Sequence, residues 1–198
     1  MDEWLRLVWR STFGKQLDGS RLVFVDEMGT HTSLAPLYAY APRGKRASYK
    51  VPRNRGKNTT LLASIGWEGM GPSMSIEGST TKEVFEAYIE YFLVPVLRSG
   101  QVVVRDNLSA HKGERVKELI EKRGCELLYL PPYSPDLNPL EEAFAKVKAL
   151  LRKVAARSRG ASVEAMGAAL DAITAQDAHG FFGHCGYRAP VQPLCQTL

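Results

Sequence analysis

Two stretches decide the fold: VVVRDNLSAHKGERV (residues 102–116) and LLYLPPYSPDLNPLEEAFAKVKALLR (residues 127–152). The first opens on three valines, and a short β-branched run of this kind is typical of a strand buried in a sheet. We predict this strand over 101–105, ending at Asp106. A helix is predicted next, over about 112–123, and Gly124 ends it.

The second stretch repeats the pattern of a strand followed by a helix. Residues 126–130 predict another strand, and the rigid, Pro-rich segment PPYSPDLNP follows it. A long helix is then predicted from near Pro139 to about residue 157, because apolar residues recur there at helical spacing. This order of elements indicates parallel strands that are joined by helical connections.

The residues upstream predict the rest of the sheet. We expect strands at 21–25, 34–41 and 58–66, with 72–77 extending or neighbouring the third, and a helix from about Ser79 to Pro95. Antiparallel strands followed by parallel ones predict a mixed α/β sheet of five strands with helices on both faces.

The composition limits the class of protein. A chain of 198 residues with 44% hydrophobic and 24% charged residues fits one ordinary globular domain with a possible helical extension. Its three cysteines are far apart, which indicates reduced thiols and not a secreted disulfide framework. We find no apolar run of the roughly 18 residues that a membrane span needs and no signal peptide. We therefore expect a cytoplasmic protein without a membrane partner.

Three acidic residues occupy places from which they can meet. Asp26 and Asp106 each end a predicted strand, and Glu141 lies in the first turn of the long helix. If the two strands are neighbours, their ends place two carboxylates side by side, and the Pro-rich loop returns the helix across the same edge. Clustered carboxylates are hard oxygen ligands that suit Mg²⁺ or Mn²⁺, and a pair of such ions activates phosphodiesters for cleavage.

Each acid also has an ordinary structural explanation. An Asp at a strand end is a common turn former, and Asn138 with Glu141 fits the start of a capped helix. Glu142 competes with Glu141 for the third position. Glu142 precedes Lys146 by four residues, which predicts a surface ion pair, whereas Glu141 lies beside the small Ala145. We prefer Glu141 and keep Glu142 as a supporting residue.

Together with FVDEMG at residues 24–29, the two quoted stretches closely resemble the mariner superfamily of transposases, and most of all its bacterial insertion-sequence 630 branch. In that superfamily an Asp-Asn pair near a His precedes a Ser-Pro-Asp-Leu-Asn-Pro segment that leads into a catalytic acid. Here 34 residues lie between Asp106 and Glu141. The resemblance covers about residues 20–190. It implies a ribonuclease H-like fold and a catalytic, metal-binding triad of Asp26, Asp106 and Glu141 that holds two Mg²⁺ or Mn²⁺ ions.

The activity that the resemblance implies is cleavage of transposon-end DNA by water, followed by transfer of the 3′-hydroxyl into target DNA. It also implies a homodimer when DNA is bound. Members usually carry helix-turn-helix domains before the catalytic domain, so we consider an upstream reading frame that encodes one as a partner. We divide the chain into an N-terminal helix or linker (1–19), a ribonuclease H-like catalytic domain (20–160) and a C-terminal helical extension (161–198).

Two other functions fit the same residues. One is a ribonuclease H-like nuclease that only hydrolyses DNA, and the other is an inactive remnant that binds DNA without cutting it. The joining reaction separates the transposase from the nuclease, since a nuclease inserts no 3′-end into a target. Retention of all three acids argues mildly against a remnant.

A basic segment supplies candidate contacts to double-stranded DNA. Residues 43–57 hold seven Lys or Arg and no acid, and such clusters bind the phosphate backbone, although a charge run is also often a solvated face. The candidates are Arg43, Lys45, Arg46, Lys50, Arg53, Arg55 and Lys57. Further basic residues follow on or just after the long helix, and those on one face are expected to line the same duplex: Lys146, Lys148, Arg152, Lys153, Arg157 and Arg159.

Two residues close to Asp106 are supporting candidates. Asn107 would hold a metal-bound water or orient the loop, and His111 would contact the scissile phosphate. Both also fit an ordinary turn or helix start. Glu27 is expected on the opposite side of the strand from Asp26, because successive side chains in a strand alternate.

Overall fold

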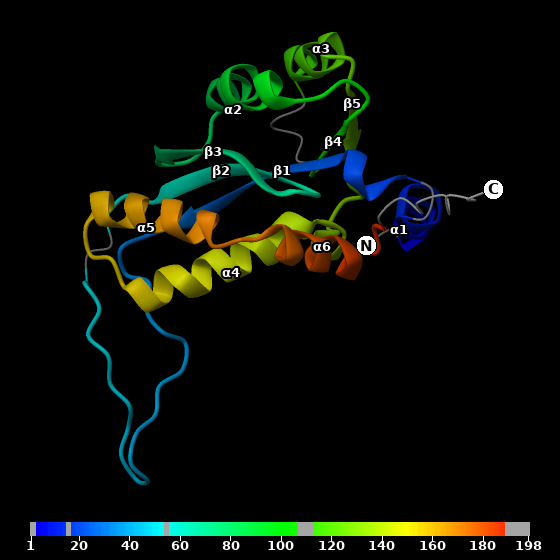
Figure 1. Ribbon diagram of the computed structural model, residues 1–198. Helices are drawn as coiled ribbons and strands as arrows, with labels where there is room; N and C mark the ends of the chain where they lie inside the picture. Colours follow the sequence, from blue (N-terminus) through cyan, green and yellow to red (C-terminus); the bar gives the residue numbers. More distant parts are fainter. Residues whose placement is uncertain (1–2, 15–16, 54–55, 107–112, 189–198) are drawn as a thin grey trace, which may run out of the picture.

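Five strands form one mixed sheet in the order β3-β2-β1-β4-β5 (Figure 1). The computed structural model describes residues 3–14, 17–53, 56–106 and 113–188. The strands are β1 (Leu22–Thr30), β2 (Thr59–Gly66), β3 (Gly69–Glu77), β4 (Val102–Arg105) and β5 (Glu126–Tyr129). β2 pairs antiparallel with β1 and β3, whereas β4 pairs parallel with β1 and β5. The predicted mixed sheet of five strands is confirmed.

The prediction of a strand at 34–41 is wrong. The residues between β1 and β2 extend away from the sheet as a long loop (Figure 1), and those from 34 to 41 belong to no strand. Tyr38 and Tyr40 are almost fully exposed there. A strand is stable only when a neighbour completes its hydrogen bonds, and Pro36 also lacks a backbone donor. The fifth strand is instead β3, which includes the segment 72–77.

Among the described residues, six α-helices accompany the sheet: α1 (Glu3–Trp9), α2 (Lys82–Tyr88), α3 (Glu114–Lys122), α4 (Pro139–Val154), α5 (Arg159–Asp171) and α6 (Ala175–His184). α2 continues as a π-helical turn (Ile89–Leu93) and a 3₁₀ turn (Val94–Val96). α4 ends three residues earlier than predicted, because Ala155 adopts a left-handed conformation with φ of 52°. Within the described ranges, no helix combines the length and the apolar character that crossing a membrane requires.

The two faces of the sheet carry two separate cores. α2 and α3 cover one face, and α4, α5 and α6 cover the other (Figure 1). In β1, Phe24 packs under α4 and α6, whereas Val23 and Val25 pack under α2 and α3. In β4, Val104 and Val103 divide in the same way. Because side chains alternate along a strand, even-numbered residues of β1 and β4 face α4.

Residues near both ends of the described chain join the core beside α4. The indole nitrogen of Trp9 donates to the hydroxyl of Tyr187 (2.9 Å), which in turn donates to the carbonyl of Leu137 (2.7 Å). An isolated parallel bridge links Asp18 to Arg188. Residues from all three predicted divisions of the chain therefore contribute to one hydrophobic cluster.

α1 also contacts the Pro-rich loop that precedes α4. The guanidinium groups of Arg6 and Arg10 donate to one carboxylate oxygen of Asp136, at 2.8 and 2.6 Å. Arg6 donates in addition to the carbonyl of Tyr133 (3.3 Å). The loop is thus held from the side of α1 as well as from the core.

Candidate active site

The register between β1 and β4 brings Asp26 next to Asp106. Val25 and Arg105 form the last parallel pair, and the two acids follow directly. Neighbouring strands lie about 4.8 Å apart, and even-numbered residues of both strands face α4. Position and register therefore place the two acids side by side at the point where β4 ends, with Asp26 on the face of the sheet that α4 covers.

Asp26 does not end its strand, contrary to the prediction. β1 continues to Thr30, because β2 pairs with it as far as Thr59. Only the parallel partner β4 stops at this level. Asp26 thus lies where β1 no longer has β4 beside it, and the end of β4 leaves room next to the carboxylate.

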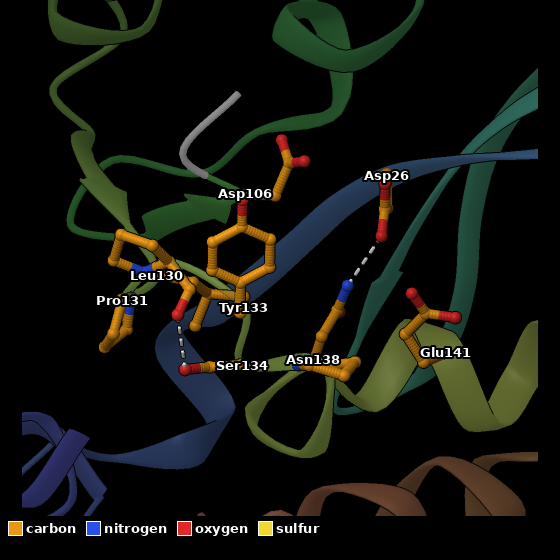
Figure 2. Close-up of a pocket in the computed structure, with 10 residues that line it drawn as sticks. Asp26, Asp106, Leu130, Pro131, Tyr133, Ser134, Asn138 and Glu141 are labelled. Carbon is orange, nitrogen blue, oxygen red and sulfur yellow. Dashed lines mark hydrogen bonds between the residues drawn. The ribbon is translucent and has the colours of Figure 1, made fainter. Parts of the chain in front are cut away.

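The Pro-rich loop and α4 bring Glu141 to the same place. The loop follows β5, forms a 3₁₀ turn at Pro135–Leu137 and ends at Asn138, whose side chain caps α4. Leu140 and Phe144 are buried in the core, so they fix the rotation of the helix about its axis. Glu141 then points toward Asp26 and Asn138 (Figure 2).

The three predicted acids line one cavity of about 430 Å³ (Figure 2). The Pro-rich loop forms most of the remaining wall: Leu130, Pro131, Pro132, Tyr133, Ser134, Pro135 and Asn138. Tyr133 is 83% exposed and has a φ of 55°, which is rare for a residue with a side chain. Its ring lies between the loop and Asp106 in Figure 2.

The carboxylate of Asp26 is held by two hydrogen bonds. The backbone N–H of Glu27 donates to one oxygen, Oδ1, and the side-chain amide of Asn138 donates to the other, Oδ2, both at 2.7 Å. Burial, with a smaller contribution from the negative charges of Asp106 and Glu141, raises the pKa of Asp26 to about 7. Its charged form is therefore disfavoured unless positive charge is brought close.

These residues fit a hard divalent cation in their chemistry. Carboxylate oxygens are the ligands that Mg²⁺ and Mn²⁺ prefer, and the mutual repulsion at Asp26 is what a cation would relieve. Within the part of the chain that the structure describes, no three His, Cys, Asp or Glu side chains lie close enough to form a ready metal cluster. A bound cation would have to draw the carboxylates together.

Arg105 is a residue of this site that sequence reasoning missed. Its side chain is buried on the opposite face of the sheet, with the guanidinium 4.3 Å from the centre of the Phe85 ring. One guanidinium nitrogen lies 3.8 Å from a carboxylate oxygen of Asp106. Burial lowers the pKa of Arg105. An arginine at the end of an otherwise apolar strand was the available signal.

Glu142 lies outside the cavity of the three acids. It lines a neighbouring cavity of about 700 Å³ and contacts Nδ1 of His184 on α6 at 2.5 Å. The expected ion pair with Lys146 is wrong, since Lys146 pairs with Asp177 of α6 at 2.7 Å. Successive helix residues point about 100° apart, and this rotation turns Glu142 toward α6 and away from the cavity.

Three further residues were considered beside the acids: Asn107, His111 and Glu27. Asn107 and His111 lie outside the described residues. Glu27 is exposed and does not line the cavity, in agreement with its predicted place on the other side of the strand.

The basic segment lies in the long loop between β1 and β2. Five of its candidates are exposed there: Arg43, Lys45, Arg46, Lys50 and Arg53. Arg55 lies outside the described residues, and Lys57 pairs with Glu77 of β3 at 2.9 Å. The base of the loop is fixed by Arg157, which donates to the carbonyls of Thr32 (2.8 Å) and Leu34 (3.0 Å).

Three of the six basic residues on or after α4 make contacts inside the protein. Besides Lys146 and Arg157, Arg159 donates to Glu77 at 2.5 Å. The positive charge of these three residues is therefore partly satisfied by ion pairs and hydrogen bonds within the protein. Lys148, Arg152 and Lys153 remain candidates for DNA contact on this helix.

A known family and several known proteins are similar to this chain in sequence. The sequence model of the family described as DDE superfamily endonuclease matches residues 21–162. The transposable element Tcb2 transposase of Caenorhabditis briggsae is 31% identical over 108 residues, which are 52% of this chain and 40% of that protein. The Tcb1 transposase of the same organism is 28% identical over 123 residues, 59% of this chain and 43% of that protein. The chain spans about two fifths of the length of these relatives.

Solved structures share the arrangement of the sheet and helices. A pre-cleavage Mos1 transpososome superposes with a TM-score of 0.71 at 18% identity, covering 93% of this chain and 57% of that chain. The catalytic domain of Mos1 mariner transposase gives a TM-score of 0.58 at 17% identity, covering 93% and 84%. At such identities the likeness shows the fold, and the predicted ribonuclease H-like fold is confirmed.

Proposed function

The chain belongs to the family of DDE superfamily endonucleases, and from this premise we propose that it is the catalytic domain of a mariner-type transposase of the bacterial insertion-sequence 630 branch. The proposed reaction is cleavage of transposon-end DNA, followed by attack of the freed 3′-hydroxyl on target DNA. The observation that carries this proposal is the cavity shared by Asp26, Asp106 and Glu141, to which three separate elements contribute.

We assign the three acids to a site for Mg²⁺ or Mn²⁺. Paired-end complexes of Mos1 have been solved with Mn and with Mg, and the carboxylates here have the matching donor chemistry. When bound, two such ions polarise the scissile phosphate and assist departure of the leaving oxygen. The protein's own part is to hold Asp26 between two hydrogen-bond donors and to balance part of the charge of Asp106 with Arg105.

The wider partners of the domain are proposed on charge and on likeness. The exposed basic loop would contact the phosphate backbone of double-stranded DNA. The Mos1 structures include paired-end and strand-transfer complexes, and we extend to this chain a homodimer that forms on DNA. We also propose that an upstream helix-turn-helix frame supplies recognition of the transposon ends. Residues 20–160 are proposed as the catalytic domain, between the N-terminal helix or linker (1–19) and the C-terminal helical extension (161–198).

A strand-transfer assay tests the proposal. A pre-cleaved oligonucleotide with a free 3′-hydroxyl is incubated with supercoiled plasmid and Mg²⁺ or Mn²⁺. We expect joined products that fall by about 100-fold or more in Asp106→Asn and Glu141→Gln, since each removes a ligand from ions that contribute several kcal/mol. Glu142→Gln is the matched control, because it removes the same charge one residue away, and it should keep most of the activity.

The other outcomes point to different functions. Metal-dependent nicking without joining would favour a nuclease that only hydrolyses. A folded protein that binds DNA but gives no product would indicate an inactive remnant, unless fusion to an upstream helix-turn-helix domain restores joining. Loss of activity in Glu142→Gln, with Glu141→Gln active, would move the third catalytic position to Glu142.

A further inference from the structure

One buried side-chain amide connects Asp26 on β1 with the start of α4, the helix that carries Glu141. The side chain of Asn138 donates through Nδ2 to Asp26 on β1 (2.7 Å), and its Oδ1 accepts from the backbone N–H of Leu140 on α4 (3.1 Å). Asn138 is 4% exposed. The helix N–H has to meet an oxygen, so the amide nitrogen is the atom that faces Asp26.

The backbone of Asn138 extends this connection to Glu141. Its carbonyl accepts from the N–H of Glu141 at 3.1 Å, and its own N–H donates to the carbonyl of Pro135 at 3.0 Å. A single residue thus fixes the start of α4, the loop before it and the carboxylate of β1. Asp26 and Glu141 belong to elements that are far apart in sequence, and Asn138 hydrogen-bonds to both.

Capping alone does not account for this residue. Serine, threonine and aspartate cap helices about as well as asparagine, and α2, α5 and α6 are capped by hydroxyls of Thr81, Ser158 and Thr174. A hydroxyl side chain is too short to cap the helix and also reach Asp26. An aspartate would place a second negative charge against Asp26.

The hydrogen bonds leave the carboxylate of Asp26 ready for a cation. A carboxylate has about four lone-pair positions. The N–H of Glu27 and the amide of Asn138 each occupy one, on different oxygens. Both oxygens therefore retain a second position, and the carboxylate cannot rotate without losing a bond.

We propose that Asn138 is a positioning residue, which orients Asp26 relative to Glu141 so that the site binds its divalent cation tightly. This inference rests on the proposed function. Hydrogen-bond partners of metal ligands typically contribute 10- to 100-fold to metal affinity. Removal of the amide donor should therefore weaken Mn²⁺ binding by about that factor, whether or not DNA is present.

The test separates two roles of the Asn138 side chain: donation of a hydrogen bond to Asp26 and capping of α4. Asn138→Ser keeps a capping oxygen and removes the donor, whereas Asn138→Ala removes both. Binding of Mn²⁺ alone is measured by calorimetry and by the electron paramagnetic resonance signal of free Mn²⁺, and thermal unfolding is followed in the same samples. We expect both variants to bind Mn²⁺ about 10- to 100-fold more weakly. Only Asn138→Ala should also lose thermal stability, by about 2–4 °C for a lost cap in a chain of this size.

The outcomes distinguish this inference from the proposed function. Wild-type affinity for Mn²⁺ in a folded Asn138→Ser variant would overturn the positioning role alone. Failure of the wild type to bind Mn²⁺, or wild-type binding by Asp106→Asn and Glu141→Gln, would overturn the metal site and the inference with it. Weakened binding in Asn138→Ser that matches Asn138→Ala supports the inference.

A measurement on the wild-type protein needs no substitution at Asn138. Its side-chain amide resonances are followed by nuclear magnetic resonance during a titration with Mg²⁺. Because the amide donates to Asp26, the resonances should shift with the same apparent Kd as the calorimetric titration with Mg²⁺. Resonances that stay unchanged at saturating Mg²⁺ would contradict the proposal.

Discussion

At Asp26 two effects act on one carboxyl group. Burial and the neighbouring acids raise its pKa to about 7 from an ordinary value of 3.8, while the donors from Glu27 and Asn138 hold it in place. The charge that a cation requires is therefore unfavourable in the metal-free protein. The metal-free protein is therefore less stable when this carboxyl group is charged, and perturbed pKa values of this kind are typical of functional sites.

We predict that the metal-free protein loses stability as the pH rises from about 4 to 7. Between these values the folded protein binds more protons than the unfolded chain, so unfolding becomes easier with rising pH. The raised pKa corresponds to a loss of folding stability on the order of 2–4 kcal/mol, where the lower value allows for partial screening of Asp26 by solvent. In Asp26→Asn this loss should be absent, which urea unfolding between pH 4 and 8 with a chelator would show.

Two comparisons check the origin of this effect. Glu27→Gln removes an adjacent but exposed charge and should keep nearly the wild-type dependence on pH. Addition of Mg²⁺ at pH 8 should stabilise the wild type but not Asp26→Asn, because only the wild type gains a ligand in its folded state. Parallel curves for the wild type and Asp26→Asn would show that burial does not penalise this carboxylate.

The three acids can be identified from the sequence, whereas their contacts cannot. Asp26 and Asp106 follow apolar runs, and Glu141 begins a capped helix, so local pattern and family resemblance were sufficient to select them. The amide of Asn138 reaches a residue 112 positions away, and no local pattern contains that pairing. Arg105 ends an apolar strand, which was a signal in the sequence, but its contacts with Phe85 and Tyr129 join it to other elements.

Among the elements, α4 and α6 are joined by charges as well as by packing. Asp177 forms a capping box with Thr174 at the start of α6 and pairs with Lys146 of α4. The hydrogen bond from Lys146, followed by those from Thr174, lowers the pKa of Asp177 to about 2. This contribution to stability is present above pH 4 and is lost as the pH falls through about 2.

We predict that Asp177→Ala lowers the melting temperature by a few degrees at pH 7. The variant removes both the box and the ion pair, and its difference from the wild type should shrink toward pH 2. Thermal unfolding followed by circular dichroism at both pH values measures this. Asp171→Ala, which removes an exposed acid at the end of α5, should unfold like the wild type. Equal melting temperatures for all three proteins at pH 7 would contradict the prediction.

Elements that depend on the local sequence pattern were predicted correctly. The wrong predictions concern strands whose existence or length depends on a neighbouring strand. The central strands and α4 follow clear apolar periodicity. The strand expected at 34–41 has weak alternation, and only the tertiary structure reveals that no neighbour lies beside it. The end of β1 was placed too early, because the antiparallel partner residues that extend it lie 29 to 37 positions away in the sequence.

For the molecule as a whole, charge is concentrated on one extended loop. The exposed residues Arg43, Lys45 and Arg46 lie on it, and Arg157 fixes its base to the helical side of the protein. We propose that these exposed charges contact a DNA backbone beyond the cavity.

We predict that replacing Arg43, Lys45 and Arg46 together by alanine weakens binding to duplex DNA by about 10- to 100-fold, whatever the DNA sequence, because phosphate contacts are lost. A gel-shift titration measures the change. The control replaces three exposed basic residues of α3, on the other face of the sheet: Arg115, Lys117 and Lys122. Equal weakening in both triple variants would mean that net charge, and not the loop, governs binding.

The ion pairs that Arg6 and Arg10 form with Asp136 of the Pro-rich loop are a second contact whose strength depends on ionic strength. The side chain of Asp136 is 43% exposed and that of Arg10 is 55% exposed, so dissolved ions screen their attraction over about 8 Å in physiological buffer. Added electrolyte would then loosen a wall of the cavity that the three acids line, while it also weakens the proposed contact with nucleic acid. The dependence of DNA binding on electrolyte concentration would therefore combine both effects. An Asp136→Asn variant lacks the ion pairs with Arg6 and Arg10, so its dependence would report the contact with DNA alone.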